Sequence, residues 1–121
     1  MAVIRYLVDN VDRAVAFYTG RLGFALSNRR GPPFAIVTRG DLVLWLSGPG
    51  SSAARPMPDG QKPGPGGWNR LVVEVGDLDA TVAELKRAGV GFRNEIVSGP
   101  GGRQILAEDG CGNVVELFQP A

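Results

Sequence analysis

The chain has 121 residues, of which 44% are hydrophobic and 21% are charged, and its formal net charge is +1. This length suits one domain with a real core, and the composition is that of a folded globular protein. A nearly neutral chain argues against nucleic-acid binding and membrane-surface binding, since both usually need a basic patch. No apolar run is long enough to span a bilayer. We therefore expect neither nucleic acid nor a membrane as a partner.

Histidine is absent from the sequence, and Cys111 is the single cysteine. The absence of histidine excludes Ser-His-Asp and Cys-His catalysis, as well as zinc, iron and nickel sites built from histidine. A general base would have to be Asp, Glu, Lys, Tyr or Cys. One cysteine forms no internal disulfide, and the first residues enter a strand-like pattern at once, so we expect a cytoplasmic protein without a signal peptide.

An internal repeat organises the chain. Residues 8–16 (VDNVDRAVA) resemble residues 75–83 (VGDLDATVA), and residues 41–47 (DLVLWLS) resemble residues 112–118 (GNVVELF). These matches occur in the same order along the chain, which favours a duplication over coincidence.

More than half of the residues between the two repeats are Gly or Pro, which is typical of a loop or linker. We therefore predict a single domain over residues 1–121. It would contain a first module over 1–48, a Gly/Pro-rich linker over 49–67 and a second module over 68–121.

Each module shows the same order of predicted elements: one strand, one helix and three strands. The helices are indicated by apolar residues on one face, by Asp9 or Asn10 and Asp77 as N-caps, and by Gly23 and Gly89 at the ends. The strands are indicated by apolar and β-branched runs between turn residues. The predicted strands cover residues 3–8, 24–30, 34–39 and 42–47, then 71–75, 92–97, 103–108 and 113–119.

Two motifs resemble a known family. Residues 16–24 (AFYTGRLGF) and residues 108–118 (EDGCGNVVELF) are similar to the opening and closing motifs of the vicinal-oxygen-chelate superfamily, which includes glyoxalases, bleomycin-resistance proteins and extradiol dioxygenases. The second motif departs from the usual pattern at Gly110 and Cys111. The resemblance implies an α+β fold in which two βαβββ modules form an eight-stranded open cup around a ligand. It also implies a homodimer.

The resemblance further implies four metal-ligand positions, which fall here on Val3, Trp45, Arg70 and Glu116. Metalloenzymes of the family mostly place His and Glu there. Glu116 is the only one of the four that binds metals, and hard cations need several oxygen ligands. We therefore predict no metal and no cofactor.

The alternation of side chains along strands predicts which residues line the cup. We expect Arg70 to pair with Glu116, although a Glu116 that merely faces water is the plain alternative. Aromatic side chains would form a wall, while Phe17, Tyr18, Phe24 and Phe92 are expected in the core. The predicted ligand-binding residues are Trp45, Trp68, Arg70, Glu116, Phe118, Val3, Arg5 and Phe34.

Three functions fit these features. The first is a metal-free bacterial protein that sequesters a planar, hydrophobic small molecule, such as an antibiotic, and so gives resistance by binding. The second is a metal-independent enzyme of the same superfamily that uses Glu116 as general acid or base. The third is a protein that binds a metabolite and signals through partners. We favour the first function, which needs no catalytic residue.

Overall fold

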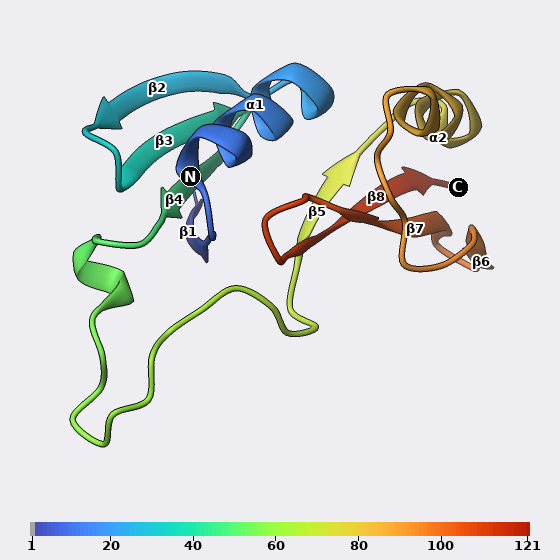
Figure 1. Cartoon of the computed structure of the whole chain (residues 1–121). Helices are drawn as coiled ribbons and strands as arrows, with labels where there is room; N and C mark the ends of the chain where they lie inside the picture. Colours follow the sequence, from blue (N-terminus) through green and yellow to red (C-terminus); the bar gives the residue numbers. More distant parts are fainter. Residues whose placement is uncertain (1) are drawn as a thin grey trace. The chain divides into compact units, whose positions relative to one another are not determined.

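The computed structural model describes residues 2–121 of the chain. Contacts divide the chain into two units, Met1–Gly66 and Gly67–Ala121. Each unit contains one α-helix and one four-stranded sheet, which confirms the predicted α+β fold with two βαβββ modules (Figure 1).

The first unit contains a mixed sheet with the strand order β1-β4-β3-β2. Strand β1 runs parallel to β4, while the pairs β3–β4 and β2–β3 are antiparallel. The elements of this unit are β1 (Ala2–Leu7), α1 (Val11–Leu22), β2 (Ala25–Arg30), β3 (Phe34–Arg39), β4 (Leu42–Ser47) and the short 3₁₀ helix η1 (Ser52–Ala54).

Helix α1 begins and ends where the sequence predicts. The Asn10 side chain accepts a hydrogen bond of 2.9 Å from the backbone N–H of Arg13, which satisfies one of the unpaired donors of the first turn. Gly23 ends the helix in the left-handed conformation (φ 75°), which glycine adopts without strain. The helix buries its apolar face, which includes Ala14, Tyr18 and Leu22.

The two faces of the first sheet differ. Ala35, Val37, Leu44 and Leu46 are fully buried and form the core on the side that α1 covers. Because side chains alternate along a strand, the residues between them point to the opposite face. On that face, Trp45 lies opposite Arg5 on one neighbouring strand and opposite Ile36 on the other. The second face of this sheet therefore carries the polar and aromatic residues.

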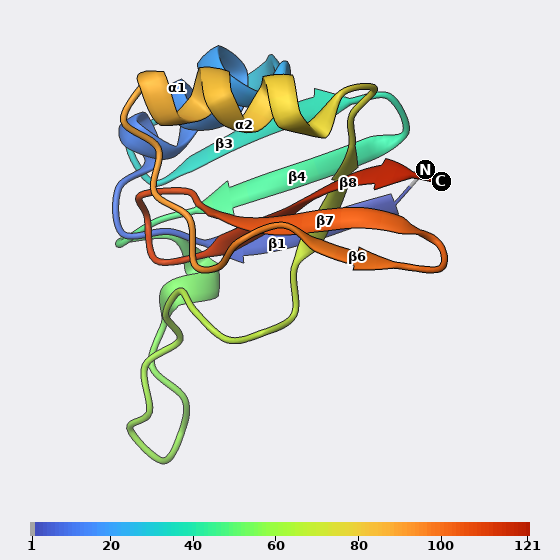
Figure 2. The same ribbon diagram turned by 90° about the vertical axis from the view of Figure 1, so that its right-hand side faces the viewer.

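The second unit repeats this topology with the strand order β5-β8-β7-β6, and α2 contacts β8 (Figure 2). Asp77 caps α2 by accepting a hydrogen bond of 3.0 Å from the backbone N–H of Ala80, as predicted. Leu78, Val82 and Leu85 are buried. The elements are β5 (Leu71–Glu74), α2 (Leu78–Arg87), β6 (Val97–Gly99), β7 (Gly102–Glu108) and β8 (Val114–Pro120).

The strand predicted over residues 92–97 is wrong for most of its length, because β6 begins only at Val97. Phe92 forms an isolated bridge to Ala107. The Asn94 side chain then accepts the N–H of Leu106 at 2.9 Å, where a paired strand would supply a backbone carbonyl. Phe92 is partly exposed, not in the core as expected, whereas Phe17, Tyr18 and Phe24 are buried.

The Gly/Pro-rich segment predicted as a linker starts with ordered contacts to the first unit. The backbone N–H of Gly48 donates to the Pro33 carbonyl at 2.8 Å, and the Ser51 hydroxyl donates to the Gly48 carbonyl at 2.7 Å. These bonds position Ser51 and η1 beside the end of β4. In residues 2–121, neither helix has the length and apolar character needed to cross a membrane.

Candidate ligand-binding site

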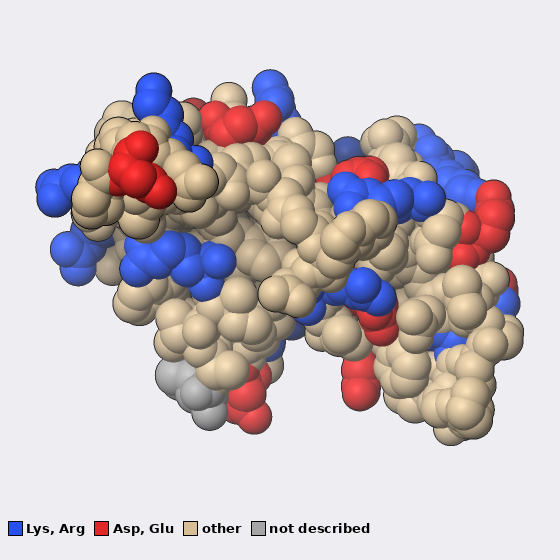
Figure 3. Space-filling view, turned by 90° about the horizontal axis from the view of Figure 1, so that it is seen from below, with Lys and Arg blue, Asp and Glu red and all other residues tan. Residues whose placement is uncertain are grey.

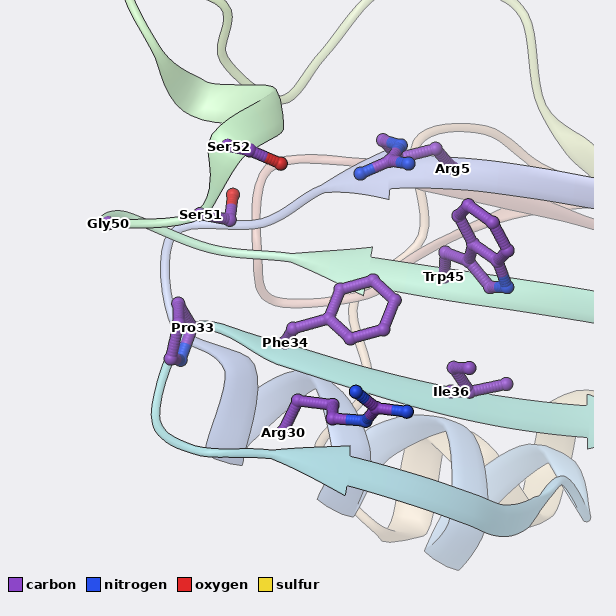
Figure 4. A pocket seen from close by; sticks show the side chains of 9 residues that line it. All are labelled: Arg5, Arg30, Pro33, Phe34, Ile36, Trp45, Gly50, Ser51 and Ser52. Atoms are coloured by element: carbon purple, nitrogen blue, oxygen red, sulfur yellow. The ribbon is translucent and has the colours of Figure 1, made fainter.

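A pocket of about 520 Å³ lies on the face of the first sheet opposite α1 (Figure 4). All four strands of the sheet contribute to it, together with the segment that follows β4. Its lining consists of Arg5, Arg30, Pro33, Phe34, Ile36, Trp45, Gly50, Ser51 and Ser52.

Two aromatic rings form the floor of the pocket. The Phe34 and Trp45 rings meet edge to face, with their centroids 5.9 Å apart and their planes at 77°. Ile36 lies beside Trp45 in the register of β3 and β4 and extends this apolar surface. Both rings are only partly buried, and Figure 4 shows them standing off the sheet into the pocket. Parts of both rings are therefore exposed to the pocket and can contact a flat ligand.

Polar groups surround the floor. The Arg5 guanidinium lies over the Trp45 ring, 4.9 Å from its centroid, and its Nη1 donates to the Ser47 hydroxyl at 3.1 Å. The Ser52 hydroxyl points towards the pocket on the same side as Arg5, and Arg30 lies on the other side of Phe34 (Figure 4). The lining contains two arginines and no acidic residue. The formal charge of the lining is therefore +2.

Charged side chains elsewhere are mixed, and Figure 3 shows basic groups interspersed with acidic ones on one face. Ion pairs of 2.7–2.9 Å join Arg29 to Asp12, Arg70 to Glu116, Arg93 to Glu108 and Arg103 to Asp79. By contrast, within residues 2–121 neither Arg5 nor Arg30 forms an ion pair with a carboxylate.

The pocket brings together three of the predicted ligand-binding residues: Arg5, Phe34 and Trp45. Val3 is not among the lining residues; it lies opposite Val43 on β4 and is 50% exposed. Three residues of the lining were not expected from the sequence: Arg30, and Ser51 and Ser52 within the predicted linker. For Arg30 the sequence offers one signal, the Gly31–Pro33 turn between two predicted strands, and the structure pairs Arg30 with Phe34 across this turn.

The other four predicted residues, which include Trp68, lie in the second unit. Arg70 and Glu116 form the predicted ion pair: Nε and Nη2 both donate to Oε1, at 3.1 and 2.9 Å, and Glu116 is 8% exposed. Arg70 Nη1 also donates to the Trp68 carbonyl at 3.2 Å. Phe118 lies opposite Glu74 on β5 and is partly buried. Arg70 is thus held at two points beside a buried carboxylate.

Trp68 precedes β5 and is 69% exposed, so it does not occupy a strand position in this unit. The Arg93 guanidinium lies over its ring, 5.2 Å from the centroid. Glu108 accepts a hydrogen bond from Arg93 Nε at 2.8 Å and thereby raises the pKa of that guanidinium. The indole is therefore stacked on a paired arginine.

The residues at the four family metal positions do not fit a divalent cation. Val3, Trp45 and Arg70 supply no metal-binding oxygen, and the Arg70 guanidinium holds Oε1 of Glu116. Nor does the part of the chain that the structure describes contain a group of three or more His, Cys, Asp or Glu side chains arranged to hold a metal. A cationic side chain beside a single carboxylate opposes metal binding.

The comparisons with known proteins establish the family. A family model described as Glyoxalase/Bleomycin resistance protein/Dioxygenase superfamily matches residues 1–117, and the chain belongs to this superfamily. No curated protein matches the sequence.

Solved structures with this fold include binding proteins and an enzyme. TnmS3, an antibiotic-binding protein from Streptomyces sp. CB03234, is 27% identical with a TM-score of 0.74, over 98% of this chain and 93% of its own. The bleomycin-binding protein of Streptomyces verticillus is 24% identical with a TM-score of 0.65, over 99% and 95% of the two chains. Lactoylglutathione lyase from Agrobacterium tumefaciens is 18% identical with a TM-score of 0.78, over 98% and 92%. The last two similarities concern the fold alone.

Proposed function

We propose that this protein binds and sequesters a planar, largely apolar small molecule, such as an antibiotic, in the pocket of the first unit. The observation that carries the proposal is the partly exposed Phe34–Trp45 floor in a pocket of about 520 Å³. Pockets for small molecules commonly measure roughly 300–1,000 Å³ and combine apolar walls with a few polar groups. The proposed binding requires neither a metal nor a catalytic residue.

The energetics favour a flat aromatic ligand. Stacking on an aromatic ring contributes about 0.5–1.5 kcal/mol beyond the area that it buries. The Phe34 and Trp45 rings are held in place by their mutual contact and, for Trp45, by Arg5. A ligand that stacks on them therefore loses little free energy to ordering of the site. TnmS3 is an antibiotic-binding protein, which supports a small-molecule ligand for this chain.

A thermal-shift screen of planar aromatic natural products and divalent metals tests the proposal, because a ligand raises the melting temperature by mass action. We expect aromatic compounds to raise the melting temperature and metals to leave it unchanged. Trp45→Ala is expected to weaken binding of a hit by about 2–4 kcal/mol, the range typical of aromatic hot spots. Glu116→Gln is the matched variant, since it keeps the shape of a side chain outside the pocket lining.

An enzyme that uses Glu116 as its base predicts the reverse result. Glu116→Gln would then abolish turnover of the hit, whereas Trp45→Ala would bind it normally. That combination would show that the protein is a catalyst and not a binding protein.

We also propose that the protein is a homodimer in the bacterial cytoplasm. The support is the usual assembly of the family and the opposite net charges of residues 1–48 and 68–121. Light scattering at micromolar concentration is expected to give twice the chain mass of 12.8 kDa. A monomer mass under these conditions would refute the dimer.

A further inference from the structure

We propose that the ligand is an aromatic acid whose ionised group binds at the Arg5 end of the pocket, between the Arg5 guanidinium and the Ser52 hydroxyl. This inference rests on the proposed function and adds the chemical class of the ligand. It is carried by the arrangement of charge around the aromatic floor.

Arg5 is held in position and remains accessible. The Trp45 ring and the Ser47 hydroxyl fix its guanidinium, yet the residue is exposed. A guanidinium has five N–H donors in a fixed plane, and the bond to Ser47 is the only hydrogen bond of this one within residues 2–121. Its remaining donors suit the two oxygens of a carboxylate or the oxygens of a sulfonate.

Ser52 provides a second donor at the same end. Its hydroxyl is directed into the pocket on the side of Arg5 (Figure 4). The neighbouring Ser51 hydroxyl already donates to the Gly48 carbonyl, a bond that positions the start of η1. Ser52 therefore faces the pocket from an ordered segment, and its hydroxyl completes a site for an anion.

Arg30 adds a second positive charge to the lining of the pocket. It lies at the end of β2, three strand spacings from β1, which separates the two arginine backbones by about 14 Å across the sheet, and it is offset by two residues along the strands. No acidic residue of the lining offsets either charge, and the apolar floor between them reduces screening. A neutral arene fills the floor but leaves both charges without a counterion. The ring of an aromatic acid packs on the floor, and its ionised group neutralises the charge of Arg5.

A matched pair of probes tests this inference: 2-naphthoate and 2-naphthamide have the same ring and differ in charge. Calorimetric titrations are made with the wild type, Arg5→Met, Arg5→Lys and the control Arg13→Gln, an exposed arginine on α1. We expect the wild type and Arg13→Gln to bind naphthoate about tenfold more tightly than naphthamide. Arg5→Met should bind both probes equally, and Arg5→Lys should retain part of the preference.

If circular dichroism shows that Arg5→Met does not fold, two further measurements test the inference. Ser52→Ala should reduce the preference for naphthoate, and added salt should weaken naphthoate binding to the wild type more than naphthamide binding. If the wild type binds both probes equally and Trp45→Ala binds neither, the inference is wrong and the proposed function stands. Binding of neither probe would overturn both.

Discussion

At the scale of single residues, two of the four positions that hold metal ligands in the family's metalloenzymes form an ion pair in this chain. Arg70 and Glu116 form an ion pair in which both hydrogen bonds fall on Oε1 of a carboxylate that is 8% exposed. A buried carboxylate is costly unless it is paired, so the arginine is required mainly to compensate this charge. Arg70 therefore offsets the cost of burying Glu116, and the pair has no part in the proposed binding.

This role leads to a stability prediction. Arg70→Met should lower the free energy of unfolding by about 2 kcal/mol, because it leaves the Glu116 carboxylate buried without a cation. The double variant Arg70→Met with Glu116→Gln should recover most of that loss, since the uncompensated charge is gone. Urea denaturation of both variants measures the two effects. An unchanged midpoint for Arg70→Met would contradict this account.

The sequence predicts some site residues well and others not at all. The expected ion pair and the place of Trp45 follow from the family resemblance, which implies the four metal-ligand positions, and the internal repeat agrees with these positions. Arg30 and Ser52 are different. Their place in the pocket depends on the turn that brings β2 beside β3 and on hydrogen bonds around Gly48, which strand periodicity does not encode.

At the scale of elements, local signals determine the helices more reliably than the short strands. Asn10 and Asp77 cap their helices as predicted, because a side-chain acceptor at the N-cap satisfies a local donor whatever surrounds it. The stretch before Val97 departs from a strand because the Asn94 side chain replaces a backbone acceptor. The alternation of apolar and polar residues in the sequence does not indicate that a side chain takes the place of a backbone acceptor here.

The caps can be tested directly. Asp77→Ala should lower the free energy of unfolding by about 1 kcal/mol, because the N–H of Ala80 loses its acceptor. Glu84→Ala, an exposed position on the same helix, is the control and should change stability little. Chemical denaturation followed by circular dichroism gives both values. Equal effects of the two substitutions would show that the cap contributes nothing.

The ion pair between Asp79 and Arg103 should make stability depend on pH. The hydrogen bonds from Arg103, at 2.8 and 2.9 Å, hold the pKa of the Asp79 carboxyl below its usual value. Because the folded-state pKa is the lower one, this contribution is present above the unfolded pKa of about 3.9 and is lost as pH falls through the folded pKa.

Wild type should therefore be more stable than Asp79→Asn at pH 7, and the difference should vanish at acid pH as Asp79 becomes protonated. Thermal unfolding between pH 2 and pH 7 measures this difference. A constant difference over the whole range would refute the ionic explanation.

At the scale of the whole molecule, the sequence predicts that the two units share one topology. It does not predict how the residues on their sheets differ. Both units have a βαβββ order and the same strand pairing, as the repeated segments indicate. Within the first unit, the uncovered face of the sheet forms an aromatic pocket with two arginines. In the second unit, the matching strands hold a buried ion pair instead. That the two modules form one cup stays a prediction.

A planar aromatic ligand in the pocket of the first unit will change the chemical environment of the residues that line this pocket. NMR spectra of the isotopically labelled protein, recorded for backbone and indole N–H groups during titration with 2-naphthoate, measure this change. We expect the largest shifts at the Trp45 indole and at the backbone amides of Phe34, Ile36 and Ser52, with Trp68 little changed. Shifts centred on Arg70 and Glu116, or no saturable shifts at all, would show that the ligand does not bind in this pocket.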